Sequence, residues 1–363
     1  MSFRLLDRNM LLRCLTGLFL LLPALPGHAL VTCIGTAQQL SEALTSASTS
    51  TDTSILIKLR TGNYAAAAGG NFQTTMILSN QNIEISGGWS GSGNGCQTKS
   101  NDAADTIITG FSGAPALFVG MASGVSGSRL HVHDLTLSNT AYSGASAACL
   151  SASVSANSEA LFERLQMVQC LAPNGTNSAG TLRNMGGVLT MRDVYVRASV
   201  ARSNGGLSVS TSDGGASRLS HLSITNTASA LSQSLISGLY IENLTSSTTY
   251  LSNSVIWGND PDAGTADVFA SGNDINLTRV HYGKLSGVTA SNIAPGTGDP
   301  GFVAYNNPRP RADSILVDSG VDSPPGGYGS FDAAGGARVI GAAVDIGAFE
   351  SDQLFTDGFQ TAP

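Results

Sequence analysis

Ionisable side chains recur at one position of a repeated sequence pattern. Arg164, Asp193 and His221 stand 29 and 28 residues apart, and each directly precedes an apolar residue. Together they offer the acid, base and cation that a polysaccharide lyase or glycosidase uses for proton transfer. Stacked side chains of alternating charge also stabilise the corner of a repeat structure without any reaction, and this structural interpretation is favoured. The three residues are therefore catalytic candidates, while a ladder of polar contacts is the main expectation.

Four further side chains are the candidates for ligand contact. Tyr195 and Arg197 belong to one repeat, and Trp257 and His281 belong to later ones. Strand alternation directs them outward, because the residues beside them in the strand are expected to face inward. The chain has only two tryptophans, and an aromatic ring on a flat strand surface can stack on the apolar face of a sugar. The sequence predicts either a carbohydrate-contacting strip or side chains that loops cover.

Metal sites are only weakly indicated. Asp260, Asp262 and Asp267 share one loop and could hold Ca²⁺ through their carboxylates, but they lack the spacing of a complete calcium loop. The histidines, His131 and His133 among them, show no zinc-binding spacing with cysteines. No cofactor is expected beyond this calcium candidate. The sequence also has no Gly-His-Gly or Arg-Ile-Lys motif, which argues against a polygalacturonase, and no serine-hydrolase elbow.

An internal repeat predicts the elements that position these residues. Six segments share the pattern apolar-x-x-apolar-x-apolar. Their middle positions, at intervals of 30, 29, 28, 32 and 26 residues, are Leu135, Leu165, Val194, Leu222, Ser254 and Val280. After each middle position, apolar residues alternate with a period of two, as in a strand with one buried face. The residue before each middle position is expected at a corner of the coil; these residues are Asp134, Arg164, Asp193, His221, Asn253 and Arg279. Stacked repeats of this length form a solenoid. We therefore predict an all-β, right-handed parallel β-helix over residues 54–300, with the six middle positions in one interior column.

The open end of a solenoid exposes unpaired strand edges and needs a cap. Within residues 30–53, Thr36 and Gln39 form the signature of a helix start. An apolar face follows, made of Ala37, Leu40, Leu44 and Ala47. The sequence therefore predicts a short N-terminal capping helix over the first coil.

Residues 1–29 have the features of a secretory signal peptide. A basic start precedes an apolar stretch from Cys14 to Leu25, and Gly27 and Ala29 are small residues suited to cleavage. The mature protein is expected to be secreted or held at the cell surface, as a monomer without a transmembrane segment. A net charge of −7 with only 12% charged residues argues against nucleic acid as a partner. An extracellular polysaccharide or a cell-surface molecule is the expected partner.

Four cysteines outside the signal peptide predict two disulfides in an oxidising compartment. Cys149 and Cys170 are 21 residues apart, close to one coil, so they can meet across adjacent turns. Cys33 precedes the capping helix and Cys96 lies in a loop after Trp89. We predict the pairs Cys149–Cys170 and Cys33–Cys96.

Several segments resemble successive landmarks of the choice-of-anchor Q group of bacterial proteins. They include Ile85-Ser-Gly-Gly-Trp89, Asp299-Pro-Gly-Phe302 and, most specifically, Val344-Asp-Ile-Gly-Ala-Phe-Glu350. The resemblance implies an exported right-handed β-helix, related in pattern to polymorphic outer-membrane proteins, that ends near residue 300. It also implies an irregular C-terminal cap and tail over residues 301–363. The group is defined by its shape more than by a reaction.

The leading hypothesis is a non-enzymatic, exported β-helix with an adhesin-like or carbohydrate-contacting role. The first alternative is a polysaccharide lyase or glycosidase that uses Arg164, Asp193 and His221. The second is a structural spacer without a small ligand. Fold alone does not choose between them, because one fold carries many unrelated functions.

Overall fold

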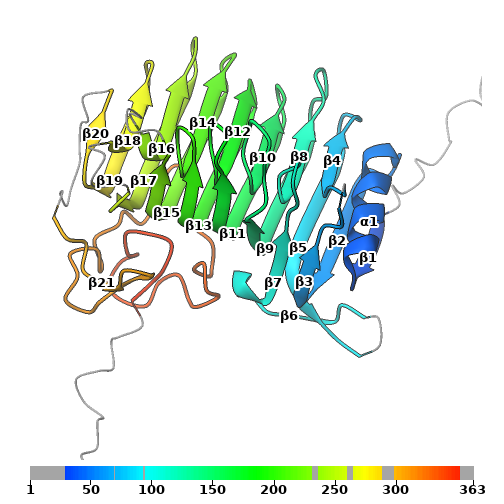
Figure 1. Cartoon of the computed structure of the whole chain (residues 1–363), viewed down its shortest axis with the longest axis horizontal. Helices are drawn as coiled ribbons and strands as arrows, with labels where there is room; N and C mark the ends of the chain where they lie inside the picture. Colours follow the sequence, from blue (N-terminus) through cyan, green and yellow to red (C-terminus); the bar gives the residue numbers. More distant parts are fainter. Residues whose placement is uncertain are drawn as a thin grey trace, which may run out of the picture.

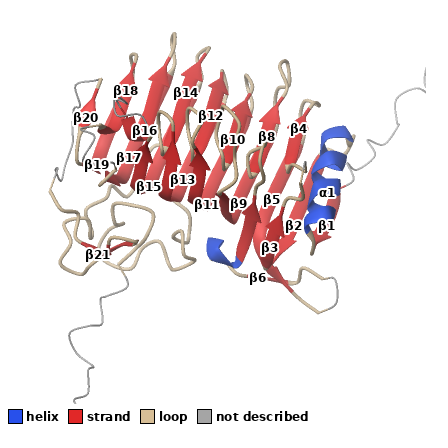
Figure 2. Cartoon of the chain, viewed as in Figure 1, coloured by secondary structure: helices blue, strands red, loops and turns tan. Residues whose placement is uncertain are grey.

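A computed structural model describes residues 29–68, 70–92, 95–230, 236–259, 265–287 and 298–351, and the predicted signal peptide lies almost wholly outside them. The chain folds into a parallel β-helix whose two long sheets run along its axis (Figure 1, Figure 2). The prediction of an all-β parallel β-helix is therefore confirmed. The large sheet contains, in spatial order, the parallel strands β1 (Ala29–Ile34), β2 (Ser54–Arg60), β5 (Asn82–Ser90), β9 (Arg129–Asn139), β11 (Glu159–Ala172), β13 (Val188–Ala201), β15 (Ala216–Ser229), β17 (Thr248–Trp257) and β19 (Ile275–Tyr282).

The second sheet and several short elements complete the coils. The second sheet is made of β4 (Gln73–Met76), β8 (Leu117–Met121), β10 (Leu150–Val154), β12 (Gly180–Met185), β14 (Leu207–Ser212), β16 (Ile236–Asn243), β18 (Ala266–Ser271) and β20 (Leu285–Ser286). The remaining elements are α1 (Ala37–Thr49), β3 (Gly62–Ala65), β6 (Thr98–Lys99), a 3-10 helix (Ala103–Asp105), β7 (Thr106–Thr109), β21 (Phe302–Ala304) and β22 (Asn307–Pro310). Of these, β3 pairs with β7, and β7 also pairs with β9.

The predicted interior column is present. Leu135, Leu165, Val194 and Leu222 pair in register across four strands, Ser254 pairs with Val280, and all six side chains are fully buried. Ser254, the polar member, satisfies its hydroxyl by donating to the Ser252 carbonyl at 2.7 Å and accepting from the Leu222 N–H at 3.1 Å. A buried hydroxyl without such partners would be costly, so the column tolerates this serine.

One residue in left-handed conformation makes the corner in each repeat. Asp134, Arg164, Asp193, His221, Asn253 and Arg279 all have φ between 45° and 58°. Asp and Asn reach this region more readily than other side chains with a Cβ, so neighbouring contacts must hold Arg164 and His221 there. All but the exposed Arg279 are buried. The corner residues thus form the predicted column on the outward side of the large sheet.

The helix α1 lies along the free edge of the second sheet, beside β4 (Figure 1). Thr36 Oγ1 accepts from the Gln39 N–H at 3.2 Å, and Gln39 Oε1 accepts from the Gly35 N–H at 2.9 Å, as the start signature predicted. Its buried face contacts the coil, and Ser48 Oγ accepts from the Thr75 N–H of β4 at 3.0 Å. Since β1 precedes the helix and pairs with β2, the parallel sheet begins before residue 54.

The C-terminal segment 298–351 is irregular apart from the β21–β22 hairpin. It packs along the outward side of the large sheet, below β13 to β19 in the view of Figure 1. Its backbone N–H groups donate to the sheet, from Ala348 to Ser223 Oγ at 2.9 Å, from Gly347 to the Asn253 carbonyl at 2.9 Å and from Val321 to Asn253 Oδ1 at 2.8 Å. The segment therefore covers one side of the β-helix and its corner column.

Both predicted disulfides are present, Cys33–Cys96 and Cys149–Cys170. The first ties the loop after β5 to β1, and the second joins the chain just before β10 to β11. Among the residues described, no helix has the length and apolar character needed to cross a membrane.

Candidate functional site

A groove crosses the outward face of the large sheet, over the parts of the strands that precede the corner residues. It has a volume of about 580 Å³ and is lined by β9, β11, β13 and β15, with Gly326 of the C-terminal segment at its border. Because these strands are parallel and in register, outward side chains form columns across them. One column contains Arg129, Glu159 and Val188, and the next contains His131, Leu161, Thr190 and Arg218.

Three arginines give the groove a positive charge. Arg129 pairs with Glu159 at 3.1 Å, and both side chains are more than half exposed, so solvent weakens this pair. Arg192 donates from Nε to Glu163 Oε2 at 2.7 Å and from Nη1 to the Gly326 carbonyl at 3.4 Å. Arg218 has no hydrogen bond or ion pair with any described residue. Arg218 therefore keeps its full donor capacity for an anionic ligand.

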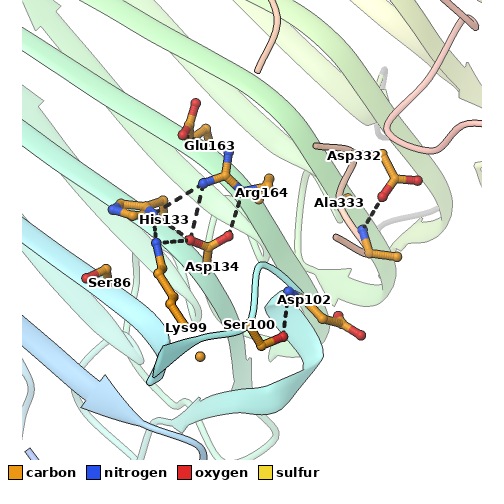
Figure 3. A network of polar contacts seen from close by, with 12 residues as sticks. Ser86, Lys99, Ser100, Asp102, His133, Asp134, Glu163, Arg164, Asp332 and Ala333 are labelled. Carbon is orange, nitrogen blue, oxygen red and sulfur yellow. Dashed lines mark hydrogen bonds and ion pairs between the residues drawn. The ribbon is translucent and has the colours of Figure 1, made fainter. Parts of the chain in front are cut away.

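A buried polar cluster lies beside the groove, at the corner of β9 and β11 (Figure 3). The Asp134 carboxylate accepts from Arg164 Nε at 2.5 Å and from Lys99 Nζ at 2.6 Å, and it lies 2.6 Å from His133 Nδ1. Burial opposes ionisation of Asp134, but the hydrogen bonds from His133 and Arg164 outweigh it and lower the pKa of Asp134 to about 2. Burial likewise opposes a charge on His133, yet Asp134 and Glu84 raise the pKa of its imidazole.

Lys99 reaches this cluster because its loop is held at two points. Strand β6 pairs antiparallel with β5 and places Lys99 opposite Trp89, whose ring lies 5.7 Å from the ammonium group. Three residues earlier, Cys96 is bonded to Cys33. The predicted disulfide thus helps to position a cation that the sequence analysis did not consider.

Glu163 connects the cluster to the groove. Its carboxylate binds Arg164 Nη1 at 2.7 Å and Arg192 Nη2 at 2.5 Å, and His131 Nε2 lies 3.5 Å from it. Burial alone would raise the pKa of Glu163, but His131 and the two arginines hold it well below its usual range. Glu163 therefore offsets part of the positive charge of Arg164 and Arg192, whereas the charge of Arg218 in the groove stays uncompensated by any described residue. Burial lowers the pKa of His131 more than Glu163 raises it, so this imidazole is neutral near pH 7.

The three catalytic candidates are brought into one column but not into the groove. Arg164 is used by the cluster, and Asp193 and His221 are fully buried beneath the C-terminal segment. Arg338 Nε of that segment lies 3.5 Å from Asp193 and 3.3 Å from Glu350. Burial raises the pKa of Asp193 to about 6 against the opposing effect of Arg338, and burial lowers the pKa of His221 well below its usual value. These are the contacts of a structural ladder, and a catalytic role for the three residues stays a prediction.

The predicted ligand-contact strip is largely covered. Tyr195 is 5% exposed beneath Ala348 and Phe349, and His281 is fully buried and bonded to the Gly298 carbonyl at 2.8 Å. Of the two alternatives that the sequence left open, coverage holds for these two side chains, because the C-terminal segment folds back over the sheet. Arg197 and Trp257 remain partly exposed. The strip's binding role stays a prediction.

Trp257 lines a second, smaller pocket of about 200 Å³ with Phe302 and Tyr305. Its ring meets Phe302 edge to face, with centroids 6.4 Å apart. The Tyr305 side chain is 63% exposed and donates to Asn226 Oδ1 at 2.7 Å. This pocket is the one described place where an aromatic residue of the predicted strip is open to a ligand.

The calcium candidates are only partly described. Asp260 and Asp262 lie outside the described residues. Asp267 is buried, and its carboxylate accepts from the Asn259 N–H at 3.1 Å, from Asn259 Nδ2 at 2.9 Å and from the Lys284 N–H at 3.0 Å. These bonds occupy Asp267 in holding two neighbouring turns together, and the calcium site stays a prediction.

Sequence reasoning missed a group of potential metal ligands. Glu84, His131 and His133 each offer one ligating atom, and these atoms all lie within 4.8 Å of one another. Sequence reasoning considered the histidines only together with cysteines, so it did not bring Glu84 together with His131 and His133. The spacing His131-x-His133 was the available signal, because alternate residues of a strand point to the same face.

The comparisons with known proteins identify no family for the chain. No protein-family model matches the chain, and a search of curated proteins found no match. Among solved structures the chain is similar to pectin methylesterase from carrot, with 15% sequence identity, a TM-score of 0.33, and coverage of 76% of this chain and 90% of that one.

Proposed function

We propose that this protein is an exported β-helix that binds an acidic polysaccharide in the groove across β9, β11, β13 and β15. The observation that carries the proposal is Arg218, a cation without a partner among the described residues, on the floor of an open groove. Arginine binds carboxylate groups through two parallel hydrogen bonds, which suits the uronic acids of such polymers.

The charge around Arg218 supports an anionic ligand. Arg129 and Arg192 line the same groove, whereas the only carboxylate among its lining residues is Glu159. Since the whole chain carries a net charge of −7, this concentration of cations runs against its average composition. A local positive field on an acidic protein directs anionic ligands to one place.

An extracellular location is consistent with the two disulfides, which persist in oxidising compartments. We propose that residues 1–29 direct export, that the mature protein is secreted or held at the cell surface, and that it is a choice-of-anchor Q protein. A surface-bound polysaccharide would give it the adhesin-like role. Trp257, in its separate pocket with Phe302 and Tyr305, is proposed as an additional sugar contact.

Polysaccharide lysis is the second candidate, and His131 is the observation that favours it. A lyase removes a proton next to a uronate carboxylate, which requires a neutral base and a cation that binds the carboxylate. His131 is kept neutral by burial and lines the groove with Arg129 and Arg192. The base in this candidate differs from the predicted set of Arg164, Asp193 and His221.

A panel of acidic and neutral polysaccharides separates these functions. The purified protein is tested for retention by each polymer and for new unsaturated or reducing ends after incubation. Retention by acidic polymers alone, without new ends, is the expected result. Unsaturated ends would make the protein a lyase, and absence of both retention and products would support the structural spacer and refute the proposal.

A further inference from the structure

Three side chains with metal-binding atoms meet where β5 and β9 run in parallel. Glu84 pairs in register with His131, and His133 follows two residues later on the same face. His133 Nε2 lies 3.3 Å from Glu84 Oε1, and the ligating atoms of all three residues are within 4.8 Å of one another. The two imidazole rings are stacked, with centroids 4.1 Å apart.

These distances suit one small ion. A four-coordinate Zn²⁺ with bonds of about 2.0–2.1 Å separates neighbouring ligand atoms by roughly 3.3 Å. The Glu84–His133 separation of 3.3 Å already has this value. His131 must rotate out of the ring stack to direct its lone pair to the same point. Its side chain is 31% exposed and lines the groove.

The surroundings of His133 also match those of a metal ligand. Its Nδ1 lies 2.6 Å from Asp134 Oδ2, so the carboxylate fixes the ring and leaves Nε2 on the Glu84 side. A carboxylate behind a ligating histidine orients the ring and strengthens it as a donor. Lys99 Nζ lies 3.0 Å from Nδ1, on the far side of the ring from Glu84, so the ammonium group does not occupy the metal position.

We propose that Glu84, His131 and His133 bind one first-row transition-metal ion, Zn²⁺ in first place, with a coordination position left open toward the groove. Two imidazoles and one carboxylate form a ligand set found in catalytic zinc sites, and imidazole prefers such ions over Ca²⁺. Because His131 also lines the groove, a carboxylate or hydroxyl group of a bound ligand can complete the coordination. The inference does not rest on polysaccharide binding, since its test contains no sugar.

The test uses the full chain, freed of metal with a chelator, and measures uptake of ZnCl₂ by isothermal titration calorimetry. Glu84→Gln and His131→Ala remove ligands whose side chains are partly exposed, so the fold should persist, and circular dichroism checks this. Glu159→Gln is the matched control, because it removes an exposed carboxylate of the same face outside the group. CoCl₂ provides a second signal through the visible absorption of four-coordinate Co²⁺.

The expected result is one ion per wild-type chain. Glu84→Gln and His131→Ala should bind it at least about tenfold more weakly than the wild type, and Glu159→Gln should bind it equally well. Co²⁺ should show the intense bands of a four-coordinate site in the wild type and in the control. Absence of saturable uptake would overturn the inference. So would uptake that the two ligand variants leave unchanged, because the ion would then bind elsewhere.

Discussion

Replacement of Asp134 by Asn tests whether the buried cluster holds the corner of β9 in place. Asn tolerates the left-handed conformation that Asp134 adopts at φ 58°, so the change removes charge without backbone strain. Arg164 and Lys99 then lose the carboxylate that binds both of them at 2.5 and 2.6 Å. Two cations would remain close together, one of them buried, with Glu163 as the nearest compensation for Arg164.

Two arguments give the magnitude. A pKa lowered from 3.8 to about 2 corresponds to about 2.5 kcal/mol of folding free energy at neutral pH. Breaking a buried ion pair by removing one partner costs roughly 3–5 kcal/mol. We therefore expect Asp134→Asn to lose about 3 kcal/mol of stability. Because the folded pKa of Asp134 is lowered, its contribution is complete above about pH 4 and is lost as the pH falls through 2.

The assay is urea unfolding followed by circular dichroism at pH 7. Glu159→Gln is the matched control, because its exposed pair with Arg129 should contribute less than about 1 kcal/mol. A loss for Asp134→Asn no larger than that of the control would refute the claim that the cluster holds the corner.

Three further predictions concern the C-terminal segment, the aromatic pocket and a disulfide. Burial, opposed by Arg338, raises the pKa of Glu350 to about 8, so its contribution to stability is complete below about pH 4 and is lost as the pH rises toward 8. The wild type should therefore melt at a lower temperature at pH 9 than at pH 6, and Glu350→Gln should show a smaller difference in thermal unfolding. Trp257→Ala should weaken polysaccharide retention about fivefold, since one stacked ring contributes ~1 kcal/mol, and unchanged binding would remove Trp257 from the site. Replacing both Cys149 and Cys170 by Ser should cost about 3 kcal/mol in denaturant unfolding, because their bond closes a loop between residues 21 apart; an unchanged midpoint would contradict this.

The interior of the β-helix was predictable because it depends on local periodicity. Leu135 and Val194 are apolar, recur once per coil and need only stack on their neighbours. The Cys149–Cys170 bond followed from the same coil length. The corner residues were also located, since each stands at a fixed place in its repeat.

The cover over the corner column was not predictable in the same way. The contact of Ala348 with Ser223 joins residues 125 positions apart and belongs to no repeat. Because the C-terminal segment lies over the sheet, His221 is buried and Tyr195 contacts Phe349. Side-chain alternation gives the face of a strand that a residue occupies, but it does not show what lies over that face.

The metal-ligand group was not predicted from the sequence for a different reason. His131 and His133 stand on one strand, but Glu84 joins them only because β5 pairs directly with β9. The intervening chain forms additional elements, among them β6, β7 and β8. The distance in sequence from Glu84 to His131 therefore exceeds the regular coil length, and the repeat could not reveal the register.

The groove is tested most directly by the affinity of the protein for polygalacturonate and for its fully methyl-esterified, uncharged form, measured with the wild type and with Arg218→Glu. Arg279→Glu is the control, because Arg279 is an exposed arginine of the same sheet outside the groove. We predict binding of the acidic polymer alone, strongly weakened by Arg218→Glu, unaffected by Arg279→Glu and reduced by salt. Equal binding of both polymers, or acidic binding that Arg218→Glu leaves intact, would contradict a polysaccharide site in this groove.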